Sequence, residues 1–164
     1  MFAVTPKTLD DKVILKHTLF DERKGQPRDW REVRIPSDER RSDRFSFAYK
    51  RMLERQFGEH GFHIWHALNE TIINYREHAH HYDPNKNVIV RSWRDDNRMY
   101  FTIGGFGEPF DPRKVWLTQE ERNKYRGDYQ RGNGFMIITG FASDVMCDDD
   151  GKSMMLIFDL KKAA

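Results

Sequence analysis

Residues 63–82 constrain this chain most, because apolar residues recur there at the spacing of one helix face. The residues of this apolar stripe are Ile64, Leu68, Thr71, Ile72, Tyr75 and Ala79. The side chains ranged away from it are His63, His66, Glu70, Asn74, Glu77, His78 and His81. A merely solvated helix face is usually built from Lys, Arg and Glu. A row of imidazoles, carboxylates and one amide therefore favours a binding or catalytic site on this helix.

Composition limits the classes of protein to consider. A chain of 164 residues is long enough for one domain with a real core. Its net charge of +2, with 33% charged residues, argues against direct nucleic-acid binding, which usually needs concentrated positive charge. Cys147 is the only cysteine, so no internal disulfide can form and a reducing cytoplasm is the expected location. No apolar run approaches a membrane span, and no signal-peptide core is expected.

The rest of the chain reads as short strands and two further helices. Gly58 and Gly61 are expected to separate the first helix from the second. The expected strands are residues 12–19, 31–36, 88–93, 98–103, 145–147 and 154–160, and the expected helices are residues 40–57, 63–82 and 135–141. A loop is expected at residues 104–109. This order predicts an α+β fold in which helices cover one face of a mixed, mostly antiparallel sheet.

Three features of this order suggest chemistry on phosphates. Glu70 and Asn74 lie one turn apart on the second helix, and Gly132 and Gly134 open the last helix. Glycines at a helix entrance let backbone N–H groups approach an anion. An amide oxygen such as that of Asn74 is a plausible ligand for Mg²⁺, and a carboxylate such as Glu70 can orient or deprotonate a hydroxyl. The pattern predicts a nucleotide phosphate site with a base beside it.

Four motifs in sequence order carry a resemblance to a known family. They are Arg-Ile-Pro-Ser-Asp at residues 34–38, Leu-Asn-Glu-Thr-Ile-Ile-Asn-Tyr-Arg-Glu-His at 68–78, Gly-Glu-Pro-Phe-Asp-Pro at 107–112 and Arg-Gly-Asn-Gly-Phe-Met-Ile-Ile at 131–138. Over roughly residues 31–162 the chain resembles the GHKL (histidine-kinase-like) ATPase superfamily. Within it, the chain resembles the small anti-sigma-factor serine kinases.

The resemblance implies a two-layer α/β sandwich of the GHKL (Bergerat) type over residues 31–164. Residues 1–30 would then be an N-terminal extension, either an arm or an extra strand. It also implies bound ATP and Mg²⁺, with Glu70 as the catalytic base, Asn74 as the metal ligand and residues 113–130 as a lid. The residues implied to contact the nucleotide are Asn74, His78, Gly107, Arg131, Gly132 and Gly134.

The same resemblance implies a regulatory role in transcription. Such proteins are typically homodimers that bind a sigma factor and phosphorylate a serine on a small antagonist protein. The expected partners are therefore a sigma factor or its antagonist, with no direct contact to nucleic acid or membrane.

Two positions depart from the family pattern and support an alternative. The family's first glycine box reads Asp-X-Gly-X-Gly, and its aspartate receives the adenine amino group. In this alignment Gly105 replaces that aspartate, and Pro109 replaces the last glycine. The alternative is a degenerate GHKL fold that no longer binds nucleotide and serves as a protein-interaction switch module. Tyr75, which stands where an alanine usually follows the asparagine, would put bulk next to the site or into the core.

Two other interpretations of the polar side chains on this helix remain. Glu70 and Asn74 can be ordinary polar residues on a half-exposed helix. The imidazoles can instead hold a metal such as zinc, with His66 and Glu70 facing one another at i, i+4. The imidazoles considered for this metal site are His63, His66, His78, His80 and His81.

Overall fold

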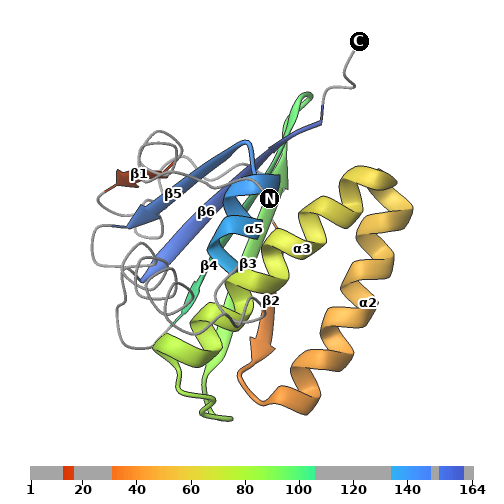
Figure 1. Ribbon diagram of the computed structural model, residues 1–164. Coiled ribbons are helices and arrows are strands. Elements are labelled where there is room, and N and C mark those ends of the chain that lie inside the picture. The colour runs from red at the N-terminus through yellow and green to blue at the C-terminus, as the bar shows by residue number, and fades with distance from the viewer. Residues whose placement is uncertain (1–12, 17–30, 106–133, 149–151, 161–164) are drawn as a thin grey trace, which may run out of the picture.

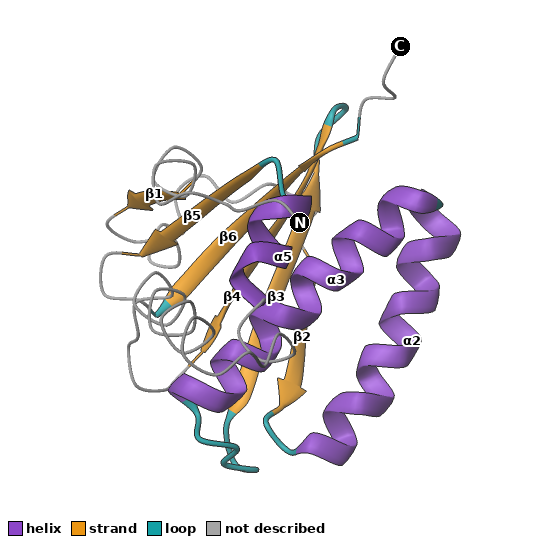
Figure 2. Ribbon diagram, in the orientation of Figure 1, coloured by secondary structure: helices purple, strands orange, loops and turns teal. Residues whose placement is uncertain are grey.

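The computed structural model describes residues 13–16, 31–105, 134–148 and 152–160. These residues form one six-stranded sheet with its helices on one face (Figures 1 and 2). The strands are β1 (Val13–Lys16), β2 (Arg31–Pro36), β3 (Asn87–Arg94), β4 (Arg98–Gly105), β5 (Asp144–Asp148) and β6 (Ser153–Asp159). The helices are α2 (Glu39–Phe57), α3 (Glu59–Asn74), the π-helical segment η1 (Tyr75–Ala79) and α5 (Gly134–Phe141). The predicted two-layer α+β architecture is confirmed.

The strand order across the sheet is β1-β5-β6-β4-β3-β2. Only β1 and β5 pair in parallel, and every other neighbouring pair is antiparallel. The β3–β4 hairpin closes at Asp95, whose Oδ1 accepts hydrogen bonds from the backbone N–H groups of Asn97 and Arg98 at 2.8 and 2.7 Å. Side-chain capping of this kind is why Asp favours tight connections. The sheet is therefore mixed and mostly antiparallel, as predicted.

The core lies between the sheet and the helices. Each strand alternates, so that one set of apolar side chains faces α3 while the other set faces away. All six residues of the predicted apolar stripe on α3 and η1 are buried, including Tyr75, whose side chain is 1% exposed. Tyr75 therefore puts its bulk into the core. The strands contribute Val88, Val90, Phe101, Ile103, Leu156 and Phe158 to the same cluster.

The corner between α2 and α3 differs from the prediction. Gly58 separates the helices with a φ of +58°, a conformation that glycine adopts without strain. The second helix begins at Glu59, however, and Gly61 lies inside its first turn. A Cβ atom on Gly61 would lie 2.2 Å from the backbone oxygen of Leu53. Gly61 thus permits close contact between the two helices, and the prediction that it breaks the helix was wrong.

Two further boundaries differ from those predicted. The helix expected over residues 63–82 is α-helical only to Asn74 and then widens into η1. Strand β4 continues through Gly104 and Gly105, where a loop was expected. Gly104 aligns with Ile89 on β3 and with Ser153 on β6, while Gly105 aligns with Val88. Strand pairing on both sides extends β4 despite the low strand preference of glycine.

No helix in the described part of the chain is long and apolar enough to cross a membrane. The single cysteine, Cys147, is buried in β5. The division between an extension at residues 1–30 and a domain at residues 31–164 stays a prediction.

Candidate functional site

Glu70 and Asn74 meet the first residue of α5. A Cβ atom on Gly134 would lie 2.8 Å from Glu70 Oε2 and 3.8 Å from Asn74 Oδ1. Helices α3 and α5 pack side by side over the sheet, so three predicted site residues from distant parts of the sequence lie together (Figure 1). A larger residue at position 134 would displace the carboxylate, so glycine lets Glu70 and Asn74 lie close to the first residue of α5.

The environment of Glu70 favours its protonated form. Burial raises the pKa of the Glu70 carboxyl, because the charged form loses hydration when it leaves water. A carboxylate with a raised pKa is a stronger base than an exposed one, which suits proton removal near neutral pH. Glu70 thus has the electrostatic character expected of a base, at the position where the sequence predicted one.

Asn74 is 8% exposed and ends α3. The π-helical segment η1 begins at the next residue and carries the half-buried His78. Segments of π-helix are rare and are frequent at functional sites, because the extra residue per turn redirects side chains. The helical spacing of the sequence gave no signal of this change.

His80 was considered only as a metal ligand from the sequence, yet the structure gives it a different setting. Its side chain is 1% exposed, and Ser37 Oγ lies 2.6 Å from its Nδ1. A Cβ atom on Gly105 would lie 3.2 Å from His80 Cε1 and from His80 Nε2. Burial first, and then the neighbouring Lys86, lower the pKa of His80. This burial depends on contacts with Ser37 and Gly105, which are distant in the sequence and give no local signal.

The described residues do not support the interpretation that the imidazoles hold a metal ion. Within the described ranges, no group of three or more His, Cys, Asp or Glu side chains could hold a metal ion. The ring of His63 stacks on Phe141 at a centroid distance of 4.6 Å, and His66 meets the edge of Phe62 at 4.2 Å. Burial lowers the pKa of His66. These two imidazoles therefore contact aromatic rings.

Several residues implied by the resemblance lie outside the described part of the chain. They are Gly107, Pro109, Arg131, Gly132 and the expected lid at residues 113–130. Their proposed contacts to a nucleotide stay predictions.

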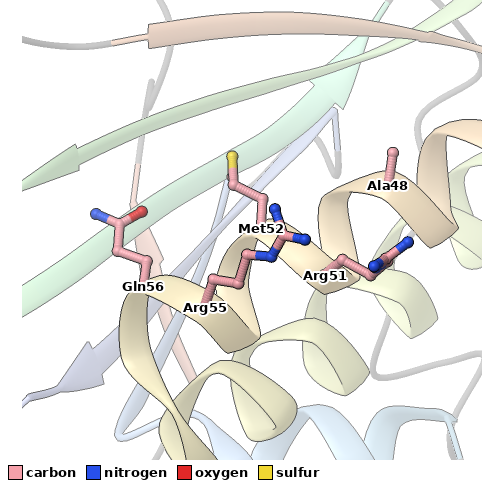
Figure 3. Close-up of a pocket in the computed structure, with 5 residues that line it drawn as sticks. All are labelled: Ala48, Arg51, Met52, Arg55 and Gln56. Carbon is pink, nitrogen blue, oxygen red and sulfur yellow. The ribbon is translucent and has the colours of Figure 1, made fainter.

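A concave surface lies on α2, away from Glu70 and Asn74 on α3 (Figure 3). It has a volume of about 460 Å³ and is lined by Ala48, Arg51, Met52, Arg55 and Gln56. All five side chains are exposed and come from one helix. This surface lacks the enclosure and the convergent polar groups of a small-molecule site.

Comparison with known protein families gives a match. The family model of the histidine kinase-like ATPase domain matches residues 50–159, which is more than half of the chain. The matched range contains α3, η1, β3, β4 and α5, and therefore Glu70, Asn74 and Gly134. No curated protein matches the chain.

Proposed function

The chain belongs to the histidine kinase-like ATPase domain family, and from this membership we propose that it is a regulatory protein that binds ATP with Mg²⁺. One observation carries the proposal: the Glu70 carboxylate and the Asn74 amide both face the N-terminal residue of α5. Gly134 has no side chain, so both polar groups lie close to the N-terminal turn of α5. The helix N-terminus favours an anion there.

The residues present fit a magnesium–phosphate group. Asn74 Oδ1 is a neutral oxygen ligand of the kind that Mg²⁺ accepts, and it borders the space that a Cβ atom on Gly134 would fill. Mg²⁺, when bound, would offset the negative charge of the phosphates. Asn74 would hold this group at the end of α3, where burial keeps its amide in one place.

Glu70 would act as the base for phosphoryl transfer to a hydroxyl group. Its carboxylate lies one helical turn before Asn74, and burial raises its pKa. A base in this position takes the proton of the attacking hydroxyl as the bond from the hydroxyl oxygen to the γ-phosphorus forms and the bond from that phosphorus to the departing ADP breaks. By the resemblance to the anti-sigma-factor kinases, the hydroxyl would belong to a serine of a partner protein.

A protein partner is part of the same proposal. Large apolar side chains are exposed over the helical layer, namely Phe47 and Met52 on α2, Phe62 on α3 and Phe141 on α5. Arg51 and Arg55 flank Met52, so a complementary partner segment would be acidic with apolar residues. By resemblance, this partner would be a sigma factor or its antagonist, and the chain would act in the cytoplasm as a homodimer.

A second candidate function is a protein-interaction switch that binds no nucleotide. The contacts of Gly105 favour it. A Cβ atom there would lie 2.6 Å from the backbone oxygen of Asn87, so the family's aspartate cannot be restored without moving β3. Simple restoration of Gly105→Asp is therefore a poor test, and direct titration with nucleotide separates the two functions.

Calorimetric titration with ATP and ADP, with and without Mg²⁺, tests the proposal. We expect micromolar binding of ATP to the wild-type chain that depends on Mg²⁺. Asn74→Ala is expected to weaken ATP binding by about tenfold or more in the presence of Mg²⁺. Glu70→Gln is expected to keep ATP binding and to lower phosphoryl transfer by about 10²- to 10⁴-fold.

Asn69→Ala is the matched control, because it removes the same side chain from the same helix. Asn69 instead accepts a hydrogen bond from Ser46 on α2 at 3.4 Å, so its loss should leave ATP affinity unchanged. No heat at millimolar ATP would favour the interaction switch. Equal ATP affinity in the wild type and in Asn74→Ala would contradict the role given to Asn74.

A further inference from the structure

The imidazole of His80 is a buried polar group with an incomplete set of hydrogen bonds. Ser37 Oγ lies 2.6 Å from Nδ1, while Nε2 has no hydrogen-bond partner within the described part of the chain. A buried polar atom without a partner is destabilising, so most such atoms in folded proteins are paired. Nε2 can therefore form a hydrogen bond with a bound ligand.

Gly105 and the His80 ring fit one another. A Cβ atom on Gly105 would lie 3.2 Å from both Cε1 and Nε2 of His80, which is tighter than ordinary contact. The ring therefore occupies the space that a side chain of residue 105 would need. His80 Nε2 therefore lies next to Gly105, a position on β4 that has no side chain of its own.

His80 belongs to the same helical run as the proposed phosphate site. Asn74 ends α3, and η1 connects it to His80 six residues later. The five residues of η1 lie between Asn74 and His80 along this run. A mononucleotide whose phosphates lie beside Asn74 and the start of α5 would extend its base along the same run towards His80 and Gly105.

The chemistry of this imidazole suits the edge of a purine. Burial lowers its pKa, so the ring is neutral at pH 7 and carries one N–H and one acceptor nitrogen. The Ser37 hydroxyl can accept from Nδ1–H or donate to Nδ1, since a hydroxyl does both. Nε2 can thus accept a hydrogen bond from a 6-amino group or donate one to a 6-oxo group, which are the groups that distinguish adenine from guanine.

We propose that His80 reads the 6-position of a bound purine through Nε2, and that the Ser37 hydroxyl lets the site accept both 6-amino and 6-oxo purine nucleotides. This inference rests on the proposed nucleotide binding and adds the specificity-determining residue. A carboxylate at residue 105 would only accept hydrogen bonds and would select the amino group. The His80–Ser37 pair removes that selection.

Three Mg²⁺-nucleotides test the inference by titration calorimetry: ATP, inosine triphosphate and purine riboside triphosphate, which has only hydrogen at position 6. The wild-type chain is expected to bind the first two within about threefold of one another. It should bind the third about tenfold more weakly, as expected for the loss of one hydrogen bond. His80→Asn keeps a polar atom near Ser37 and removes the atom at Nε2. It should weaken ATP and inosine triphosphate binding about tenfold and leave purine riboside triphosphate binding unchanged.

His80→Gln supplies the rescue, because its longer amide can offer either an oxygen or an N–H near the position of Nε2. It should recover part of the dependence on the 6-substituent, and thermal unfolding of each variant checks that it is folded.

If His80→Asn weakened the binding of all three nucleotides equally, or of none of them, His80 would be a structural residue and the inference would be wrong. A preference of the wild type for ATP over inosine triphosphate of about 30-fold or more would also overturn it. Binding that depends on Asn74 but not on the 6-substituent would defeat this inference alone, whereas no binding of any of the three would defeat the proposed function too.

Discussion

At the scale of single residues, Ser37 connects three parts of the molecule. Its backbone N–H donates to the backbone oxygen of Lys86 at 2.9 Å, and its backbone oxygen accepts from Arg76 Nε at 3.3 Å. Its hydroxyl lies against His80 Nδ1. Each of these groups is buried, so each hydrogen bond replaces one that water would otherwise make. A small residue at the end of β2 thereby fixes the position of a histidine 43 residues later.

The burial of His80 predicts how stability changes with pH. Its pKa in the folded chain is below the ordinary value of 6.5, with burial as the main cause and Lys86, Asp83 and His81 as nearby charges. The unfolded chain therefore binds more protons as the pH falls below about 6.5. The contribution of His80 is complete above this pH and is lost as the pH decreases towards its folded pKa, at a rate of at most about 1.4 kcal/mol per pH unit.

His80→Gln should remove this contribution. Denaturant unfolding at pH 7 and pH 5 should show a smaller loss of unfolding free energy in the variant than in the wild type. His60 is exposed, and His60→Gln is the control that should follow the wild type. If His80→Gln and the wild type lost the same free energy between the two pH values, the imidazole would not be buried in its neutral form.

At the scale of helices and strands, the contact between α2 and α3 depends on Gly61. A Cβ atom there would lie 2.2 Å from the backbone oxygen of Leu53 and 2.7 Å from the backbone N of Glu54. Backbone atoms cannot move aside as a flexible side chain can. Gly61→Ala should therefore lower the unfolding free energy by about 1–3 kcal/mol, the usual effect of overpacking.

Gly140→Ala is the matched comparison. Gly140 is also helical, but it is exposed on α5 and a Cβ atom there would have no heavy atom within 4 Å. The same substitution should stabilise the chain by about 0.4–1 kcal/mol, because alanine loses less backbone entropy on folding. Urea unfolding of both variants measures the difference. Destabilisation of equal size at both positions would show that Gly61 makes no special contact.

The same elements show what the sequence could predict. The spacing of Ile64, Leu68 and Ile72 predicted the buried face of α3, because helical periodicity is a local property. The role of Gly61 was predicted wrongly. In sequence, a glycine that ends a helix cannot be distinguished from one that allows close contact with a neighbouring helix. The π-helical segment η1, which follows Asn74, has no distinct sequence pattern either. The boundaries of the helices thus depend on packing between helices and strands, which a single sequence does not display.

The candidate site was predictable only in part. Glu70 and Asn74 came from their spacing on one helix, and Gly134 came from its place at a helix entrance. Their proximity depends on α5 packing beside α3, a tertiary contact that the spacing within either helix does not display. The role proposed for His80 needed its burial against Ser37 and Gly105, and no local sequence pattern announces such a contact.

At the scale of the whole molecule, Arg76 joins the helical layer to the edge of the sheet. It projects from η1, is 5% exposed, and donates from Nη1 to Ser42 Oγ on α2 at 2.8 Å. It also donates from Nε to the backbone oxygen of Ser37, next to the last residue of β2. One guanidinium thus bonds to the β2–α2 connection at Ser37 and to α2 at Ser42. Its planar group lies 5.6 Å from the ring centre of Tyr82.

Removal of this guanidinium should therefore affect more than one element. Arg76→Met keeps an unbranched apolar side chain of similar reach but leaves Ser37 and Ser42 without their donor. We expect a loss of about 3 kcal/mol of unfolding free energy, the size typical of buried hydrogen bonds to a charged group. Arg44→Met, at an exposed position of α2, should change stability by less than about 0.5 kcal/mol. Because Ser37 also holds His80, hydrogen exchange in Arg76→Met should increase at the backbone amides of β2 and at His80 together. Exchange that increased in η1 alone would mean that the two layers are joined by apolar packing, with Arg76 only filling space between them.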